Sequence, residues 1–270
     1  DAAEEVEAAD WFDQSKQPVV ISAEDGIQLH GWLFDPDCAG AKPHLYAICC
    51  HGYSGQPQDM AKYAHRFARL GFTVLVPALR GHGLSEGRYA GMGWLDRRDL
   101  MRWISLIIGS DADARILLQG KSMGAAAVMM TVGEPDLPRN VVAAVEDCGY
   151  ASVGQQFIDC ARSMFHLPKF LAKPIVTTMG AIARRRAGYG FQEASCVEQL
   201  KHATIPMLFI HGGADDFVPS RALDENFDAC ASIDRQKLLI PSAGHSMSAS
   251  TAPVVYWKTV TNFVTRVFGL

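Results

Sequence analysis

The chain has 270 residues, 49% of them hydrophobic, and a mean hydropathy of +0.03, which indicates a folded domain with a sizeable core rather than a disordered chain. Its 25 basic and 29 acidic residues give a formal net charge of −4. No basic stripe interleaved with aromatic residues occurs, so nucleic acid is not an expected partner. The seven cysteines form no Cys-x-x-Cys pair, so neither a disulfide framework nor a zinc site is predicted.

No apolar run approaches the roughly 20 residues that a membrane-spanning helix needs. The chain begins at Asp1 rather than Met, so membrane association is expected only through an N-terminal segment outside this sequence. The cysteine content favours a reducing, cytoplasmic location. A membrane-anchored or extracytoplasmic location is the alternative if such a segment was removed.

Strand-like apolar runs alternate with segments of helical periodicity along most of the chain. The predicted strands cover residues 19–21, 27–33, 45–50, 73–76, 114–119, 141–145, 206–210 and 237–240. Helices are predicted around residues 60–67, 100–107, 125–132 and 260–267. This alternation predicts an α/β fold in which a mostly parallel central sheet of about eight strands is flanked by helices. Residues 1–270 are expected to form a single domain.

Residues 150–200 interrupt the alternation. This segment is helical in character and rich in large apolar residues such as Phe157, Phe165 and Phe170. An insertion between consecutive strands, at the sheet end where loops build sites, predicts a helical cap over a pocket; an extra packing layer is the alternative. The run Arg184-Arg185-Arg186 is expected to form a solvated helix face, or else to recruit an anionic substrate group or a membrane surface.

The segment Gly120-Lys121-Ser122-Met123-Gly124 follows a predicted strand and precedes a predicted helix. In this context a Gly-x-Ser-x-Gly sequence holds its serine on a tight turn with an exposed hydroxyl. Side chains at the two glycine positions would obstruct the unusual backbone angles and the close approach of neighbouring elements. Ser122 is therefore predicted to be a catalytic nucleophile.

A serine hydroxyl needs a neighbouring base that an acid orients. His245 follows the last predicted strand in a loop of small residues and is the predicted base. The acid is expected after the strand that ends near His211, where Asp215 is preferred over Asp216. Asp147, one strand earlier, is the third candidate.

The oxyanion of a tetrahedral intermediate needs preorganised donors. The predicted donors are the backbone amides of Met123, at the start of the helix after the serine, and of Tyr53, in the segment His51-Gly52-Tyr53-Ser54-Gly55. His51 and His211 lie at strand ends without an expected catalytic role, and His82 is expected to be structural. No metal-ligand spacing, dinucleotide fingerprint or phosphate-binding lysine motif occurs, so no metal and no cofactor are predicted.

Together with Arg80-Gly81-His82-Gly83-Leu84-Ser85 and His211-Gly212-Gly213-Ala214-Asp215-Asp216, these motifs resemble the serine α/β-hydrolases from about residue 18 to the C-terminus. The sequence looks closest to capped bacterial hydrolases near the carboxylesterases, monoacylglycerol lipases, feruloyl esterases and serine peptidases. The resemblance implies that Ser122, Asp215 and His245 are the catalytic triad and that the Tyr53 and Met123 amides are the oxyanion donors.

The expected function is hydrolysis of an acyl bond, foremost a carboxylic ester, through an acyl-enzyme intermediate. The expected partner is a small acyl substrate of apolar character, and the sequence leaves the oligomeric state open. Amide hydrolysis by a peptidase or amidase is the alternative, although the cap offers only Glu193 and Glu198 as a pair that could hold a peptide N-terminus. A thioesterase, and a catalytically inactive hydrolase fold that serves as a binding module, are the remaining alternatives.

Overall fold

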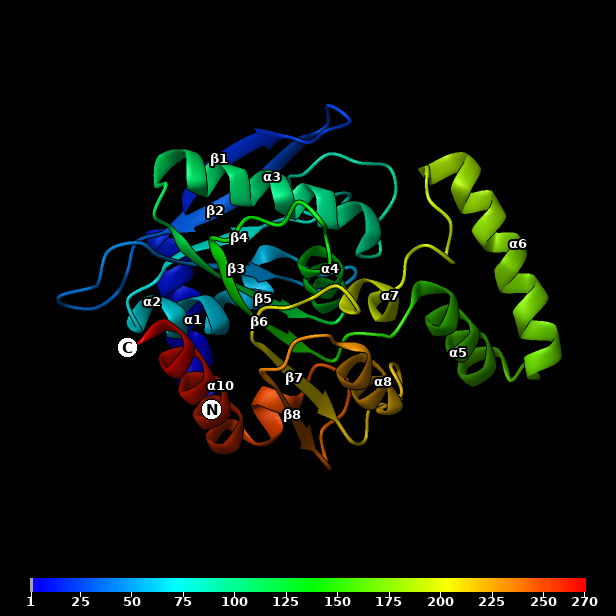
Figure 1. Ribbon diagram of the computed structural model, residues 1–270. Coiled ribbons are helices and arrows are strands. Elements are labelled where there is room, and N and C mark those ends of the chain that lie inside the picture. Colours follow the sequence, from blue (N-terminus) through cyan, green and yellow to red (C-terminus); the bar gives the residue numbers. More distant parts are fainter. Residues whose placement is uncertain (1) are drawn as a thin grey trace.

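The computed structural model describes residues 2–270. A single eight-stranded sheet has the strand order β1-β2-β4-β3-β5-β6-β7-β8 (Figure 1). Strands β3 to β8 run parallel to one another, whereas β1 and β2 form an antiparallel hairpin that pairs with β4. The strands are β1 (Gln17–Ser22), β2 (Gln28–Phe34), β3 (Leu45–Cys50), β4 (Thr73–Pro77), β5 (Arg115–Lys121), β6 (Val141–Asp147), β7 (Met207–Gly212) and β8 (Arg235–Ile240).

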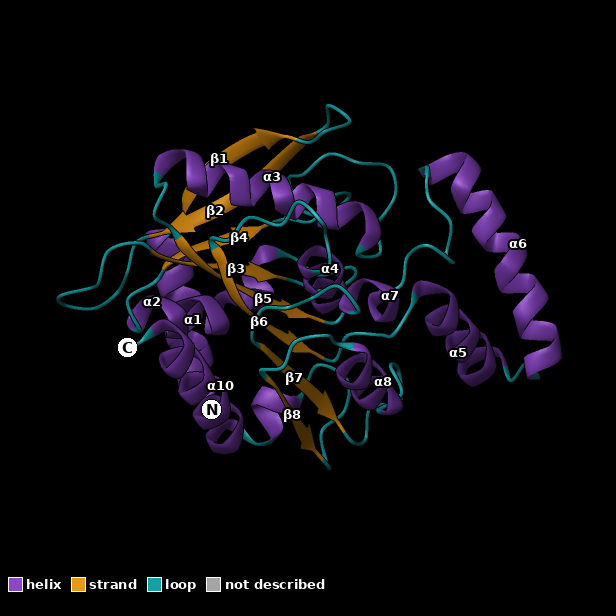
Figure 2. Ribbon diagram, viewed as in Figure 1, coloured by secondary structure: helices purple, strands orange, loops and turns teal. Residues whose placement is uncertain are grey.

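Helices cover both faces of this sheet, as Figure 2 shows. The side chains on one face pack against α3 (Trp94–Ser110), α4 (Met123–Val132), α7 (Cys196–Leu200) and α8 (Arg221–Ala229). Those on the other face pack against α1 (Ala2–Ser15), α2 (Ala61–Arg69) and α10 (Pro253–Phe268), and the short helix α9 (Ser248–Thr251) precedes α10. The predicted α/β fold is therefore confirmed.

Two hydrophobic cores lie on opposite faces of the sheet because its central strands are buried on both sides. On β5, Ile116 and Leu118 point into the core of α3 and α4, whereas Leu117 between them points into the core of α2 and α10. Such continuous burial explains why the central strands read as unbroken apolar runs rather than as alternating patterns.

The segment between β6 and β7 contains α5 (Val153–Phe165) and α6 (Lys169–Ala187) in addition to α7. In Figure 1 both helices lie beyond the carboxyl ends of the parallel strands, and α6 stands apart from the sheet. These helices come from the interruption that the sequence places at residues 150–200. Loops at the carboxyl ends of parallel strands build most sites in α/β proteins, so α5 and α6 lie at the end of the sheet where a site is expected.

All seven cysteines are free thiols in the part of the chain that the structure describes, and five of them are buried. Cys49 and Cys50 belong to β3, where they fill space as small apolar side chains. No helix within residues 2–270 combines the length and the apolar character that crossing a bilayer requires.

Candidate active site

Ser122 occupies the tight turn between β5 and α4. Its φ of 56° and ψ of −118° are values that residues with a side chain rarely adopt. The unusual backbone angles therefore fall on the serine, and the flanking Gly120 and Gly124 have no positive φ. The glycines instead permit close contact: a Cβ on Gly124 would lie 2.2 Å from the Cys50 carbonyl oxygen, and one on Gly120 would lie 2.2 Å from that of Gly124.

The surrounding backbone holds Ser122 in this conformation. Its amide donates to the Asp147 carbonyl over 2.8 Å, and its carbonyl accepts from the Ala126 amide over 3.0 Å. Gly52 packs so closely that a Cβ there would lie 3.3 Å from the Ser122 Cβ. A left-handed serine costs about 1–3 kcal/mol and persists only where its surroundings fix it.

The structure brings Ser122, His245 and Asp215 into one hydrogen-bonded chain. The Ser122 Oγ lies 2.8 Å from Nε2 of His245, and the His245 Nδ1 lies 2.8 Å from Oδ2 of Asp215. The three residues follow β5, β8 and β7, which lie within one parallel half of the sheet, so their carboxyl ends meet at one edge. Residues that are up to 123 positions apart in sequence thus become neighbours.

The Asp215 carboxylate is almost fully committed to hydrogen bonds. Its Oδ1 accepts from the amides of Phe217 (3.0 Å) and Val218 (2.8 Å), while Oδ2 faces His245 and lies 3.4 Å from Nε2 of His211. Burial opposes ionisation of this carboxyl, but hydrogen bonds from the two histidines outweigh it and hold the Asp215 pKa well below its usual value. Asp215 is therefore an anion that fixes the orientation of the His245 ring.

The two other candidate acids lie elsewhere. The Asp147 Oδ2 accepts from the Tyr256 hydroxyl over 2.8 Å, and burial raises the pKa of Asp147 to about 6. Asp216 is exposed, and its side chain has no hydrogen bond or ion pair with another residue in the described part of the chain. Neither carboxyl is hydrogen-bonded to His245, whereas Asp215 is.

His211 lies behind the Asp215 carboxylate, fully buried. Its Nε2 lies 2.9 Å from the Val218 carbonyl oxygen and 3.4 Å from Asp215. Burial disfavours the charged ring, but Asp215 and the carbonyl outweigh this and raise the His211 pKa. The sequence assigns His211 no catalytic role, yet its position makes it a residue that helps to orient the Asp215 carboxylate. Its place at the end of β7, shortly before Asp215, is the feature of the sequence from which this role could have been predicted.

Glu146, near the end of β6, is fully buried, and few hydrogen bonds offset the loss of water around its carboxyl group. Its Oε2 accepts from the Gly149 amide over 3.0 Å, and its Oε1 has no partner among the described residues. Burial raises the Glu146 pKa from 4.5 to about 8, so the side chain is protonated at neutral pH.

A pH-dependent stability follows from Glu146. Between about pH 5 and pH 8 the unfolded chain has lost the Glu146 proton and the folded chain has kept it, so rising pH lowers the free energy of unfolding. Each pKa unit corresponds to about 1.4 kcal/mol. Glu146→Gln is expected to remove this pH dependence. The free energy of unfolding of the variant relative to wild type should therefore increase by a few kcal/mol as the pH rises from about 5 to about 8. Urea unfolding of both proteins at several pH values measures it, and a pH-independent difference would contradict it.

The predicted oxyanion donors come from two separate segments of the chain. Met123 is the first residue of α4, where helical amides have no partner within the helix. Tyr53 belongs to the loop after β3, and both residues line the same cavity as Ser122. Neither amide donates a hydrogen bond to another residue within 2–270.

Two histidines fix the loop that carries Tyr53. The His51 Nε2 accepts from the Leu79 amide over 3.0 Å, and its Nδ1 donates to the Gly52 carbonyl over 2.8 Å. Burial lowers the His51 pKa to about 4, which keeps this ring uncharged. The His82 Nε2 likewise accepts from the Ser54 amide over 3.0 Å. The sequence describes these histidines as spare or structural, and the structure assigns them to the support of this loop.

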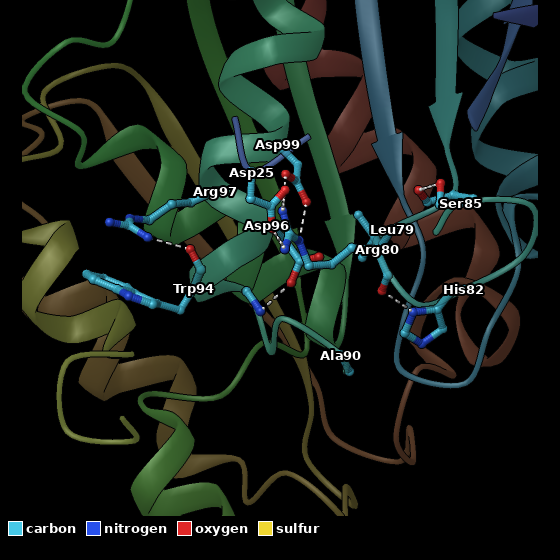
Figure 3. A network of polar contacts seen from close by, with 12 residues as sticks. Asp25, Leu79, Arg80, His82, Ser85, Ala90, Trp94, Asp96, Arg97 and Asp99 are labelled. Atoms are coloured by element: carbon cyan, nitrogen blue, oxygen red, sulfur yellow. Dashed lines mark hydrogen bonds and ion pairs between the residues drawn. The ribbon is translucent and has the colours of Figure 1, made fainter. Parts of the chain in front are cut away.

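A buried ion pair anchors His82 in turn (Figure 3). The His82 Nδ1 donates to the Arg80 carbonyl over 3.0 Å. The Arg80 guanidinium forms two 2.7 Å hydrogen bonds to Asp99 and a third, of 2.8 Å, to Asp25. A bidentate, desolvated pair of this kind defines geometry well. The Arg80-Gly81-His82-Gly83 motif therefore holds the loop that carries Tyr53 without lining the cavity itself.

A mostly apolar cavity of about 490 Å³ lies above Ser122, between the sheet and α5–α6. Helix α5 contributes Phe157, and α6 contributes Met179 and Ile182. The Tyr150 and Tyr189 rings also line it, and their hydroxyls donate to the carbonyls of Met92 and Ala90. Those hydroxyls are thereby satisfied, so the tyrosines present rings rather than free polar groups to the cavity. Arg186 is the single cationic side chain among the described residues that line it.

Two groups of side chains approach the spacing of metal ligands within residues 2–270. Cys148, Asp215 and His245 form one, and His44, Asp111 and Asp113 form the other. In the first, burial raises the pKa of the Cys148 thiol far above its usual value, and thiolate is the form that binds metals. In the second, His44 and Asp113 are exposed, and His44 already pairs with Asp111 over 2.8 Å. The chemistry of neither donor set calls for a metal.

The eight-stranded sheet, the serine turn and the residues that converge on it define a member of the α/β-hydrolase superfamily. The family model described as "Serine aminopeptidase, S33" matches residues 41–179, and the chain belongs to this family of serine hydrolases.

Curated relatives cover most of the chain. The uncharacterized protein YqkD of Bacillus subtilis is 26% identical over 94% of this chain and 81% of its own length. The uncharacterized protein Rv2307c of Mycobacterium tuberculosis is 29% identical over 84% of this chain and 72% of its own length. A thermostable monoacylglycerol lipase of Bacillus sp. is 38% identical over a short stretch, 18% of this chain and 22% of its own.

Solved structures share the fold. The esterase Pf2001 of Pyrococcus furiosus superposes with a TM-score of 0.71 at 20% identity and covers 93% of this chain and 92% of its own. The acylaminoacyl peptidase of Pyrococcus horikoshii superposes with a TM-score of 0.66 at 15% identity, over 94% of this chain and 42% of its own. At these identities the likeness establishes the fold alone.

Proposed function

We propose that the protein hydrolyses carboxylic esters of apolar acyl groups, with Ser122 as nucleophile, His245 as general base and Asp215 as the orienting acid. The observation that carries this proposal is the hydrogen-bonded chain from Ser122 through His245 to Asp215, together with the apolar cavity that Ser122 lines. Membership of a serine hydrolase family supports the reaction class.

In the proposed acylation step, the Ser122 Oγ attacks the ester carbonyl carbon while its proton passes to Nε2 of His245. The charged ring is stabilised by the Asp215 carboxylate, which faces Nδ1. The carbonyl oxygen becomes an oxyanion that accepts hydrogen bonds from the Met123 and Tyr53 amides. The intermediate then collapses, the C–O bond breaks, and His245 returns the proton to the departing alcohol.

Deacylation repeats these steps with water. His245 removes a proton from the water molecule, the hydroxide oxygen attacks the acyl carbon, and the Ser122 oxygen leaves with the proton from His245. The carboxylic acid product and free Ser122 result. In this scheme the chain supplies the nucleophile, the base and the oxyanion donors, and solvent supplies the water.

The walls of the cavity favour esters over peptides with a free N-terminus. Paired carboxylates usually hold such an N-terminus, and the two cap glutamates do not line the cavity. Glu193 lies 3.4 Å from Arg184, and Glu198 pairs with Lys201 over 2.7 Å. Amides without a charged N-terminus, and thioesters, fit the same machinery. A catalytically inactive binding module is disfavoured, because each triad position holds a side chain able to perform its role.

Hydrolysis of p-nitrophenyl esters with increasing acyl length tests this proposal, with a matched pair of variants on α6. Ala183 lines the cavity, whereas Ala181 is exposed and does not line it. Ala183→Trp is expected to narrow the cavity and shift the preferred acyl chain to shorter lengths, because the added indole ring occupies acyl space. Ala181→Trp is expected to keep the wild-type profile.

Outcomes against the proposal are equally clear. An absence of turnover on every ester by folded wild-type protein, with turnover of the corresponding anilides or thioesters, would move the function to amides or thioesters. An identical chain-length shift in both tryptophan variants would show that the cavity does not hold the acyl group.

A further inference from the structure

The charges of the chain are distributed unevenly. Residues 160–192, from the second half of α5 into the loop after α6, contain six basic residues and no acidic one. The rest of the chain has 19 basic and 29 acidic residues. The six basic residues, here called the basic cap set, are Arg162, Lys169, Lys173, Arg184, Arg185 and Arg186.

The basic cap set is also largely unpaired. Within residues 2–270, only Arg184 has an acidic partner, Glu193 at 3.4 Å, and both side chains are solvent-exposed or half-exposed. Elsewhere many arginines are matched: Arg80 pairs with Asp25 and Asp99, and Arg266 pairs with Asp234. The positive charge of α5 and α6 is therefore available to an external anion.

Large apolar side chains are exposed where these two helices meet. Phe165 at the end of α5 is 70% exposed, and Phe170 in the first turn of α6 is 75% exposed. Met164 and Leu171 beside them are exposed too, and these four residues are here called the cap tip. The cap tip lies at the edge of the molecule, away from the sheet (Figure 1). Single exposed apolar residues are ordinary, but a cluster of four marks an interaction surface.

An apolar stripe connects the cap tip to the cavity above Ser122. Leu171, Ile175, Met179 and Ile182 are spaced by four, four and three residues and lie on one side of α6. All four are exposed to a substantial degree, and Met179 and Ile182 also line the cavity. At 1.5 Å per helical residue the stripe extends over about 16 Å.

We infer that the cap tip and the basic cap set dock the protein on an anionic phospholipid surface. A helix with exposed aromatic residues beside lysines and arginines is typical of segments that lie in the interface of a bilayer. The cap tip is a projection rather than a groove, and a lipid surface accepts a projecting pair of phenylalanines without a preformed partner pocket. A second copy docked tip to tip would instead oppose two unpaired positive clusters.

The stripe gives this docking a consequence that rests on the proposed function. A lipid acyl chain that leaves the surface at the cap tip meets apolar side chains along α6 until it reaches Ser122. Docking itself needs no turnover, so it can be measured on wild type and Ser122→Ala alike, and its failure is distinguishable from the absence of esterase activity.

Flotation with vesicles tests the inference. Wild type is expected to float with vesicles that contain phosphatidylserine and to stay in solution with phosphatidylcholine vesicles. Lys169→Gln with Lys173→Gln is expected to weaken binding roughly 25-fold, since each basic residue near an anionic surface contributes about fivefold. The matched control, Arg139→Gln with Lys258→Gln, removes two exposed basic residues from other surfaces and is expected to bind like wild type.

A second pair of variants tests the apolar component. Phe165→Ser with Phe170→Ser is expected to lose vesicle binding and keep the wild-type circular dichroism spectrum, because both side chains are exposed. Val254→Ser with Val255→Ser changes two exposed apolar residues of α10 and is expected to retain binding. Equal binding to both vesicle types, absence of binding, or a concentration-dependent dimer that the phenylalanine variant abolishes would each overturn the inference.

Discussion

Ser122→Ala is expected to reduce kcat for ester hydrolysis by about 10⁶-fold, as in serine hydrolases that lose the nucleophile alone. The change removes one oxygen atom, whose hydrogen bond to His245 is the side-chain contact of Ser122. The Cβ and the backbone turn remain, so the melting temperature is expected to stay within a few degrees of wild type. Parallel measurements of turnover and thermal unfolding check both parts.

The contrast between those two measurements is what makes the experiment decisive. An unfolded variant would lose activity for a trivial reason, and its circular dichroism would reveal this. Retained turnover in folded Ser122→Ala would assign the reaction to another nucleophile. Labelling of wild type by a fluorophosphonate, with no labelling of the variant, provides a readout that does not depend on the choice of ester.

Asp215→Asn is expected to lower kcat by up to about 10⁴-fold with little change in the fold. The asparagine Oδ1 can still accept from the Phe217 and Val218 amides, so the loop after β7 retains its hydrogen bonds. Its amide group, however, donates toward the His245 Nδ1 where the carboxylate accepted. The ring is then held in the tautomer that cannot take the serine proton, and the charge that stabilises protonated His245 is lost.

Asp216→Asn and Asp147→Asn are the matched controls for that prediction. Both replace a nearby aspartate by asparagine, and neither side chain is hydrogen-bonded to His245. Each is expected to change kcat by no more than a few-fold; at position 147 an asparagine oxygen can still accept from the Tyr256 hydroxyl. A large loss in either control with a small loss in Asp215→Asn would transfer the role of the acid.

Much of the fold could be predicted from the sequence, because the central strands are buried on both faces. Eight apolar runs correspond to eight strands, and the helix that begins at Met123 follows the Gly-x-Ser-x-Gly turn. Helix α1 could not be predicted in this way. It fully buries only Ala8 and Phe12, and its contacts with α2 combine the stacking of Trp11 on His65 with ion pairs such as that of Glu4 with Arg66.

Local motifs identified the candidate site, but not all of its geometry. Ser122 and His245 stand in distinctive glycine-containing turns, whereas adjacent Asp215 and Asp216 are alike in composition. The choice between them depends on which side chain meets the Phe217 and Val218 amides, and that follows from tertiary structure. The supporting roles of His51, His82 and His211 likewise depend on carbonyl and amide groups that a sequence does not display.

Because the backbone of Ser122 has a positive φ, stability and catalysis favour different residues at position 122. Glycine would relieve the dihedral strain, since it adopts positive φ without cost, whereas the proposed chemistry requires the hydroxyl that creates the strain. Selection for turnover therefore retains serine against a pressure toward a more stable protein. In a descendant whose substrate had disappeared that pressure would act alone, and glycine at this position with an otherwise intact sheet would be the trace of a former enzyme.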